Sequence, residues 1–184
     1  MLLLETRRLL LRTVADTDVP AIHELHSLPE TDEFNTLGIP DHIQVTRDLV
    51  ADWLLKQQSI PCTAYVLALV LPAENQLIGL MGMNLGRPKS QRAEVWYKLH
   101  KDYWRKGYAS EALGRLLQFA FEELGLHRIE AGCATENTAS IKVLEKAGMQ
   151  REGRCRKILP IRGAWVDNYL YALLEEDYFS KRNG

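Results

Sequence analysis

The sequence predicts an α/β domain built on a mixed, mostly antiparallel central sheet of about seven strands flanked by helices. Three runs with strand character, 65–71, 76–85 and one starting near Arg92, follow one another without an intervening helix, as in an antiparallel meander. The third of these runs then passes through a glycine turn into an amphipathic helix, within the segment 94–112. A doubly wound nucleotide-binding fold would instead alternate strand and helix throughout, so that fold is disfavoured.

Length and composition are those of one domain, spanning 1–184, and they narrow the class of protein. A chain of 184 residues can bury a sizeable core. The formal net charge of −1 gives no general attraction to nucleic acid or to an anionic membrane, and no apolar run is long enough to cross a bilayer. The three cysteines are widely spaced and form no cluster with histidine, which argues against a metal site. They favour reduced thiols in a cytoplasmic protein.

The first third of the chain is expected to contribute one strand and two helices. A leucine-rich strand is predicted at 7–13 after a short tail, and the charges at Glu5 and Arg7 argue against a secretory signal. Asp16 or Thr17 is expected to cap a helix that ends at Pro29. A loop is predicted at 30–42, and then a second helix whose buried side comprises Val45, Leu49, Trp53 and Leu54.

The last third is expected to complete the sheet. The long helix should end at Gly125 and be followed by a strand at 128–135. Asn137 is a good cap for the next helix, which should stop at Gly148. The final two strands are predicted near 149–159 and 164–173, joined by a turn at 160–163.

The strand-turn-helix segment in the middle of the chain has the properties of an anion site. Gly107 and the small Ala109 let the backbone turn tightly, and Ser110 suits the first turn of a helix. A helix that begins in such a turn presents free N–H groups and a partial positive charge, which suits a phosphate. Arg105 and Lys106 add formal positive charge there.

Two segments resemble motifs of the GNAT N-acetyltransferases. The run WRKGYA at 104–109 is similar to the pyrophosphate loop of that family, whose usual pattern is Gln/Arg-x-x-Gly-x-Gly/Ala. The run ENTASIKVLEKAGM at 136–149 resembles the second motif, in the form carried by ribosomal-protein alanine and serine N-acetyltransferases. The segments 3–12 and 166–171 are also similar to that subfamily, so the resemblance extends over nearly the whole chain.

The resemblance implies a GNAT domain that transfers an acetyl group from acetyl-CoA to a primary amine by direct attack. In that family a splayed pair of strands leaves a backbone N–H free for the thioester oxygen. The residues that it implies for binding acetyl-CoA are Tyr97, Lys98, Leu99, Arg105, Lys106, Gly107, Tyr108, Ala109, Ser110, Asn137, Ser140 and Lys142.

Ser140 and Glu94 are the catalytic candidates. Many GNAT enzymes protonate the departing CoA thiolate with a tyrosine seven positions after the motif asparagine, but that position here is Leu144. Ser140 is the hypothetical replacement, with a plain first-turn helix residue as the alternative. Glu94 could accept the amine proton through water, although it could also simply face solvent. Asp167 and the acidic pair at 32–33 are rivals for the role of base.

Two further residues have ordinary alternatives. Trp104 stands where Gln or Arg opens the usual loop, a departure that is not expected to abolish binding. Cys133 could carry an acetyl group in a ping-pong reaction, but a strand cysteine with apolar neighbours is more often a small core residue.

The acceptor is the least defined part of the prediction. The subfamily implies a protein or peptide N-terminal α-amine, for example that of a ribosomal protein, bound near the two N-terminal helices and the loop between them. A small amine, such as a polyamine, an amino acid or an aminoglycoside, is the first alternative. A CoA-binding regulatory module without catalysis is the second, because Leu144 replaces the usual acid. The protein is expected to be a monomer or a homodimer.

Overall fold

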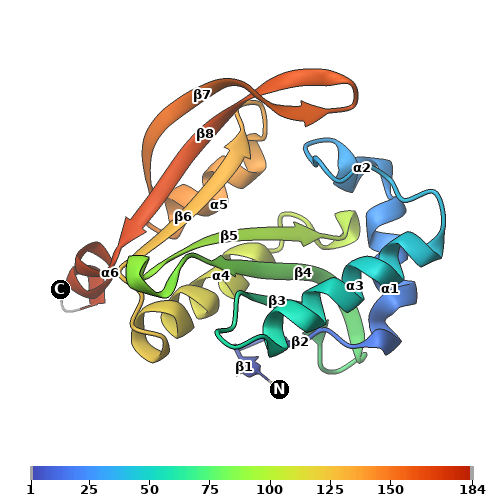
Figure 1. Ribbon diagram of the computed structural model, residues 1–184, viewed down its shortest axis with the longest axis horizontal. Coiled ribbons are helices and arrows are strands. Elements are labelled where there is room, and N and C mark those ends of the chain that lie inside the picture. Colours follow the sequence, from blue (N-terminus) through green and yellow to red (C-terminus); the bar gives the residue numbers. More distant parts are fainter. Residues whose placement is uncertain (1, 183–184) are drawn as a thin grey trace.

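One eight-stranded sheet organises the molecule (Figure 1). The computed structural model describes residues 2–182. The order across the sheet is β1-β2-β3-β4-β5-β6-β8-β7, and only β5 and β6 are parallel neighbours. The strands are β1 (Leu3–Glu5), β2 (Leu10–Thr13), β3 (Ala64–Leu71), β4 (Gln76–Leu85), β5 (Arg92–Leu99), β6 (Arg128–Ala134), β7 (Gln150–Ile161) and β8 (Ala164–Leu174). The α-helices are α1 (Val19–Ser27), α2 (Pro29–Asp32), α3 (Ile43–Gln58), α4 (Tyr108–Gln118), α5 (Thr138–Lys146) and α6 (Glu175–Arg182).

Different helices cover the two faces of the sheet, because successive strand residues point to opposite sides. Leu67 of β3 belongs to a buried cluster with Leu113 of α4. Its neighbour Val66 belongs to a separate cluster with Ile22 of α1 and Trp53 of α3. We call these the α4–α5 face and the α1–α3 face.

The parallel strands β5 and β6 pair over a short stretch and then separate. Their register runs only from Arg92 opposite Arg128 to Glu94 opposite Glu130. Beyond Glu94, β5 continues against β4 as far as Leu99, while β6 continues against β8. Figure 1 shows β6 and β8 leaning away from β5. The expected splayed pair of strands is therefore present, and it leaves one edge of β5 without a strand partner.

The sheet has one strand more than predicted. The segment taken for a tail forms β1, and Leu4 is buried there, paired with Leu11 of β2. The hydrophobic run 2–4 has a partner because the chain reverses at 6–9, where Thr6 accepts and donates several turn hydrogen bonds. Helices α2 and α6 were also not predicted.

The buried side of α3 differs from the predicted one. Thr46, Val50 and Trp53 are buried, whereas Val45 is 44% exposed. The position of α1 decides this, since His23 of α1 hydrogen-bonds Thr46 at 2.8 Å and so turns that polar residue inward. Trp53 is buried as predicted, and Leu49 and Leu54 pack against the same cluster, so the prediction was wrong only in placing Val45 on the buried side and omitting Thr46 and Val50.

The cap of α1 is also one residue later than predicted. The N-cap is Asp18, whose carboxylate accepts from the Ala15 N–H at 2.8 Å and pairs with Arg12 at 2.7 Å. Neither Asp16 nor Thr17 has this role, because a short 3₁₀ turn at 16–18 precedes the helix.

Candidate active site

The turn between β5 and α4 has the geometry expected of an anion-binding helix start. Gly107 is the N-cap of α4, with φ of +84°, and Arg105 has φ of +60°. Both values lie in the left-handed region, which a glycine adopts without strain. The first-turn N–H groups of an α-helix have no intrahelical acceptor, so this end carries a partial positive charge. The exposed Arg105 and Lys106 lie directly before it.

Arg8, which the sequence did not single out, braces this turn from the N-terminal segment. Its guanidinium donates to the Lys106 carbonyl oxygen at 2.9 Å and to the Glu111 carboxylate at 2.7 Å. It also lies 4.4 Å from the ring centre of Tyr108. Thr6 donates to the same Glu111 carboxylate at 2.6 Å. The turn is therefore held in place by contacts to residues about a hundred positions away along the chain.

Trp104 has a structural role at the position where the usual loop begins with Gln or Arg. Its indole N–H donates to the Leu99 carbonyl oxygen at 2.7 Å. Because Leu99 is the last residue of β5, this bond fixes the end of the strand relative to the turn. The side chain is 41% exposed, so it is not simply a core residue.

A pair of hydroxyl groups joins the two diverging halves of the sheet on the α4–α5 face. The hydroxyl of Tyr97, on β5, lies 2.7 Å from the hydroxyl of Ser140, on α5. The expected cap is also present, since Asn137 Oδ1 accepts from the Ser140 N–H at 3.0 Å. Burial raises the pKa of Tyr97, although the hydrogen bond from Ser140 opposes that effect. Both hydroxyl groups are therefore protonated at neutral pH.

Cys133 and Leu144 lie beside this pair but differ from it chemically. Burial raises the pKa of the Cys133 thiol to about 11, so the thiol is protonated at neutral pH and a poor nucleophile. This agrees with the expectation of a core residue rather than an acetyl carrier. Leu144, at the position of the usual tyrosine, is 1% exposed and packs in the core. A proton donor on this face must come from another residue.

Glu94 lies where β5 and β6 separate, opposite Glu130. By strand alternation it faces the α1–α3 side together with Trp96 and Lys98. Partial burial raises the pKa of Glu94, and the neighbouring Glu130 carboxylate adds to the effect. A carboxyl group with a raised pKa is a better proton acceptor than an ordinary one.

The rival bases are held in other interactions. Asp167 accepts from the Lys157 backbone N–H at 2.9 Å and from the Arg154 guanidinium at 2.8 Å. These contacts lower the pKa of Asp167, the backbone bond having the larger effect, and so weaken it as a base. Asp32 is buried and paired with Arg162, while Glu33 is exposed.

The remaining predicted residues divide between the two faces. Gly107, Tyr108, Ala109 and Ser110 lie together at the start of α4, and Asn137 and Ser140 lie together at the start of α5. Lys142 is exposed on α5. Lys98 differs from these residues, because its side chain points to the opposite, α1–α3 face. The backbone of Lys98 can still contact a cofactor on the α4–α5 face, but its side chain cannot.

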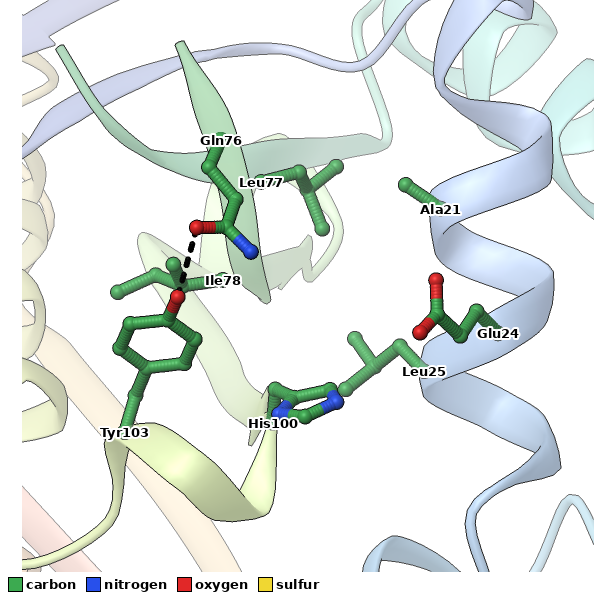
Figure 2. Close-up of a pocket in the computed structure, with 8 residues that line it drawn as sticks. All are labelled: Ala21, Glu24, Leu25, Gln76, Leu77, Ile78, His100 and Tyr103. Atoms are coloured by element: carbon green, nitrogen blue, oxygen red, sulfur yellow. Dashed lines mark hydrogen bonds between the residues drawn. The ribbon is translucent and has the colours of Figure 1, made fainter. Parts of the chain in front are cut away.

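A small pocket beside the turn after β5 is a different feature (Figure 2). It has a volume of about 50 Å³ and lies between α1 and the start of β4. At the edge of this pocket, the Tyr103 hydroxyl donates a hydrogen bond to the side-chain oxygen of Gln76 at 2.7 Å. Ligand sites usually enclose several hundred Å³, so this pocket does not accommodate a cofactor.

Residues 2–182 contain neither a membrane-spanning helix nor a cluster of metal-binding side chains. No helix in this range is long and apolar enough to cross a membrane. In the same range, no group of three or more His, Cys, Asp or Glu side chains could hold a metal ion.

Comparison with known proteins gives consistent matches. Residues 8–150 match the acetyltransferase (GNAT) domain family. N-acetyltransferase p20 of Bacillus licheniformis is 32% identical over 175 residues, which cover 95% of this chain and 97% of that protein. The ribosomal protein uS5-alanine N-acetyltransferase of Escherichia coli is 28% identical over 117 residues, 63% of this chain and 60% of that protein. The solved structure of RimL, a ribosomal L7/L12 α-N-protein acetyltransferase in complex with coenzyme A, has a TM-score of 0.85 at 21% identity. The matched region covers 94% of this chain and 98% of the RimL chain.

Proposed function

Because this chain belongs to the GNAT acetyltransferase family, we propose that it transfers the acetyl group of acetyl-CoA to the N-terminal α-amine of a protein or peptide. Two relatives named for ribosomal-protein acceptors support this choice of amine. The observation that carries the proposal is the pair of hydroxyl groups of Tyr97 and Ser140, which spans the gap between the diverging strands. The three cysteines are free, as suits a cytoplasmic enzyme.

The α4–α5 face is the proposed cofactor side. The first-turn N–H groups of α4, with Arg105 and Lys106, would bind the pyrophosphate. The unpaired edge of β5 at 97–99 would hydrogen-bond the pantetheine arm and the thioester oxygen. Asn137 orients Ser140 toward this edge through the cap bond, and Lys142 provides positive charge for a phosphate.

The reaction needs one proton removed and one supplied. The amine nitrogen attacks the thioester carbon, a C–N bond forms, and the C–S bond breaks. Ser140 donates its hydroxyl proton to the departing CoA sulfur, and the Tyr97 hydroxyl at 2.7 Å returns a proton to Ser140. Because burial raises the pKa of Tyr97, the phenol is fully protonated at neutral pH before the reaction begins. The phenolate formed by the transfer regains a proton from solvent, which balances the amine proton that passes to Glu94 and then to solvent.

Glu94 is the proposed general base. It would take the amine proton through water, since the register puts it roughly 10 Å along β5 from the thioester position. A peptide α-amine, with a pKa near 8, already has a neutral fraction at pH 7 and needs less help than a lysine near 10.4. This difference favours an α-amine over a lysine side chain as the acceptor.

The test is to incubate the protein with acetyl-CoA and a pooled panel of peptides, polyamines, amino acids and aminoglycosides. Mass spectrometry identifies the products, and release of CoA measures turnover. Acetylation of peptide α-amines is the expected result. Acetylation of polyamines or aminoglycosides alone would contradict the proposed acceptor. Binding of acetyl-CoA without any product would support a regulatory module instead.

A further inference from the structure

Three charged residues from distant parts of the chain interact on the α1–α3 face of β5, where Asp32 pairs with Arg162 and acts electrostatically on Lys98. They are Lys98 of β5, Asp32 of α2 and Arg162 at the tip of the β7–β8 hairpin. Arg162 Nε lies 3.3 Å from Asp32 Oδ2, and the same guanidinium donates to the Pro29 carbonyl oxygen at 2.5 Å. Figure 1 shows the hairpin arching toward α2. We call these three residues the Lys98 cluster.

The charges within the Lys98 cluster do not balance. Two cations share one carboxylate, so the cluster carries a net charge of +1 when all three residues are ionised. Asp32 already binds Arg162 through one oxygen. The neighbouring His26 does not change this balance. Burial lowers the pKa of His26 to about 3, so its ring is neutral at pH 7.

The ammonium group of Lys98 is the unsatisfied member of the cluster. Its nitrogen is buried and has no hydrogen-bond partner among residues 2–182, and the same holds for Asp32 Oδ1. Burial lowers the pKa of Lys98 to about 8, although Asp32 partly offsets the effect. The group is therefore still protonated at pH 7. A buried cation without a partner is unfavourable in the free protein, and an anion that binds it would remove that cost.

The position of Lys98 relates this cation to the reacting centre. Its neighbour Tyr97 points to the α4–α5 face and reaches Ser140, so the two side chains leave β5 at the same height but in opposite directions. If acetyl-CoA occupies the Ser140 side, the acceptor must approach from the Lys98 side. A group bound to Lys98 would then lie close to the amine that attacks.

We propose that Lys98 binds a carboxylate of the acceptor, so that the preferred substrate carries an acidic group next to its reacting amine. This inference rests on the proposed function and specifies its acceptor. The carboxylate can belong to an acidic residue near the N-terminus of a peptide or to a free amino acid. The same cation would repel polyamines and aminoglycosides, which bring further positive charge to the site.

The experiment compares acceptors with and without that carboxylate. Peptides with Glu or Gln at the second position are acetylated by the wild-type enzyme, Lys98→Met and Lys101→Met. Free alanine and alaninamide form a second pair, compared at equal concentrations of neutral amine because the carboxylate of alanine also raises the pKa of its amine. Lys101 is a matched control because it is a lysine only three positions after Lys98 in the chain. It is exposed, and its ammonium group pairs with Glu30 at 2.6 Å. A charge-assisted hydrogen bond is worth about 1.5–3 kcal/mol. In at least one of the two pairs of acceptors, the wild-type enzyme should therefore prefer the acceptor with the carboxylate by at least about tenfold in kcat/KM.

The variants decide whether Lys98 is responsible. In Lys98→Met the preference should fall to about one, through a higher KM for the acidic acceptor. Lys101→Met should keep the wild-type preference. Equal rates for acidic and uncharged acceptors in wild type would overturn the inference while leaving the proposed acetyl transfer intact. An equal loss of kcat for both acceptors in Lys98→Met would also overturn it, because Lys98 would then act in the chemistry.

A binding measurement is independent of turnover. The N-acetylated Glu and Gln peptides are added to the protein in the presence of CoA, and the melting temperature is recorded. The Glu product should raise the melting temperature of wild type and of Lys101→Met more than the Gln product does, and Lys98→Met should respond equally to both. Equal shifts in wild type would reject the carboxylate site even if no acceptor were turned over.

Discussion

The two faces of β5 differ in how completely their polar groups are paired. On the α4–α5 face, Tyr97 bonds Ser140, Ser140 bonds Asn137, and Arg8 bonds the turn before α4. On the α1–α3 face, the nitrogen of Lys98 and one oxygen of Asp32 are buried and have no hydrogen-bond partner in the described range, residues 2–182. Paired groups form a site that is rigid before its ligand arrives, whereas unpaired ones gain their partners only when a ligand binds. The first face suits a constant cofactor and the second a selected acceptor.

The largest effect is expected from Ser140→Ala, which removes the hydroxyl group that bonds Tyr97 on the α4–α5 face. A general acid contributes about a hundredfold or more to the rate, so kcat should fall by that factor while acetyl-CoA still binds. Turnover with saturating peptide and isothermal titration with acetyl-CoA measure the two quantities.

Tyr97→Phe is the matched control for this variant. It removes the hydroxyl behind Ser140 but leaves the proposed donor, so the loss of kcat should be smaller than for Ser140→Ala. The opposite order would assign the donor to Tyr97. Unchanged turnover in Ser140→Ala would remove Ser140 from the mechanism.

A smaller effect is expected from Glu94→Gln, on the α1–α3 face where β5 and β6 separate. The carboxyl group acts as a base only when ionised, and burial raises its pKa above the usual value near 4.5. In wild type, kcat should therefore fall as the pH drops through this raised pKa. Glu94→Gln should lower kcat about tenfold at neutral pH and remove that acidic limb.

The control for Glu94 is Glu130→Gln, which removes the neighbouring carboxylate. It should move the acidic limb to lower pH, because the repulsion that raises the pKa of Glu94 is lost. A profile of kcat from pH 5 to 9 checks both variants. An acidic limb that persists in Glu94→Gln would show that another group is the base.

Lys98→Met is expected to change stability, and the change is a gain. The pKa of Lys98 is 10.5 when unfolded and about 8 when folded, so the folded state disfavours the charged form. That penalty, about 3 kcal/mol at most, is fully present below pH 8 and disappears as the pH rises to 10.5. Lys98→Met should thus raise the free energy of unfolding near pH 7 and lose this advantage near pH 10.5.

Urea unfolding at the two pH values measures this difference. Lys101→Met should change stability little, since an exposed ion pair contributes little. A destabilised Lys98→Met at pH 7 would mean that the ammonium group has a partner in the free protein, and the contrast between the two faces would disappear.

The sequence by itself determined the family, the meander of β3 to β5, the glycine turn before α4 and the Asn137 cap of α5. All of these depend on local features. The residues of a turn or a cap are neighbours in the chain, and their backbone angles and hydrogen bonds are set within a few positions. Strand alternation is likewise local, so β3 and β4 could be predicted almost to their ends.

Only the tertiary structure decided which side chains meet. The brace of Arg8 on the turn, the contact of Tyr97 with Ser140 and the Lys98 cluster all join residues far apart in the chain. Such contacts depend on sheet register and on where each helix lies, and one sequence pattern fits several registers. The same reason explains the error at one edge of α3, where packing against α1 buries Thr46 and leaves the predicted Val45 exposed.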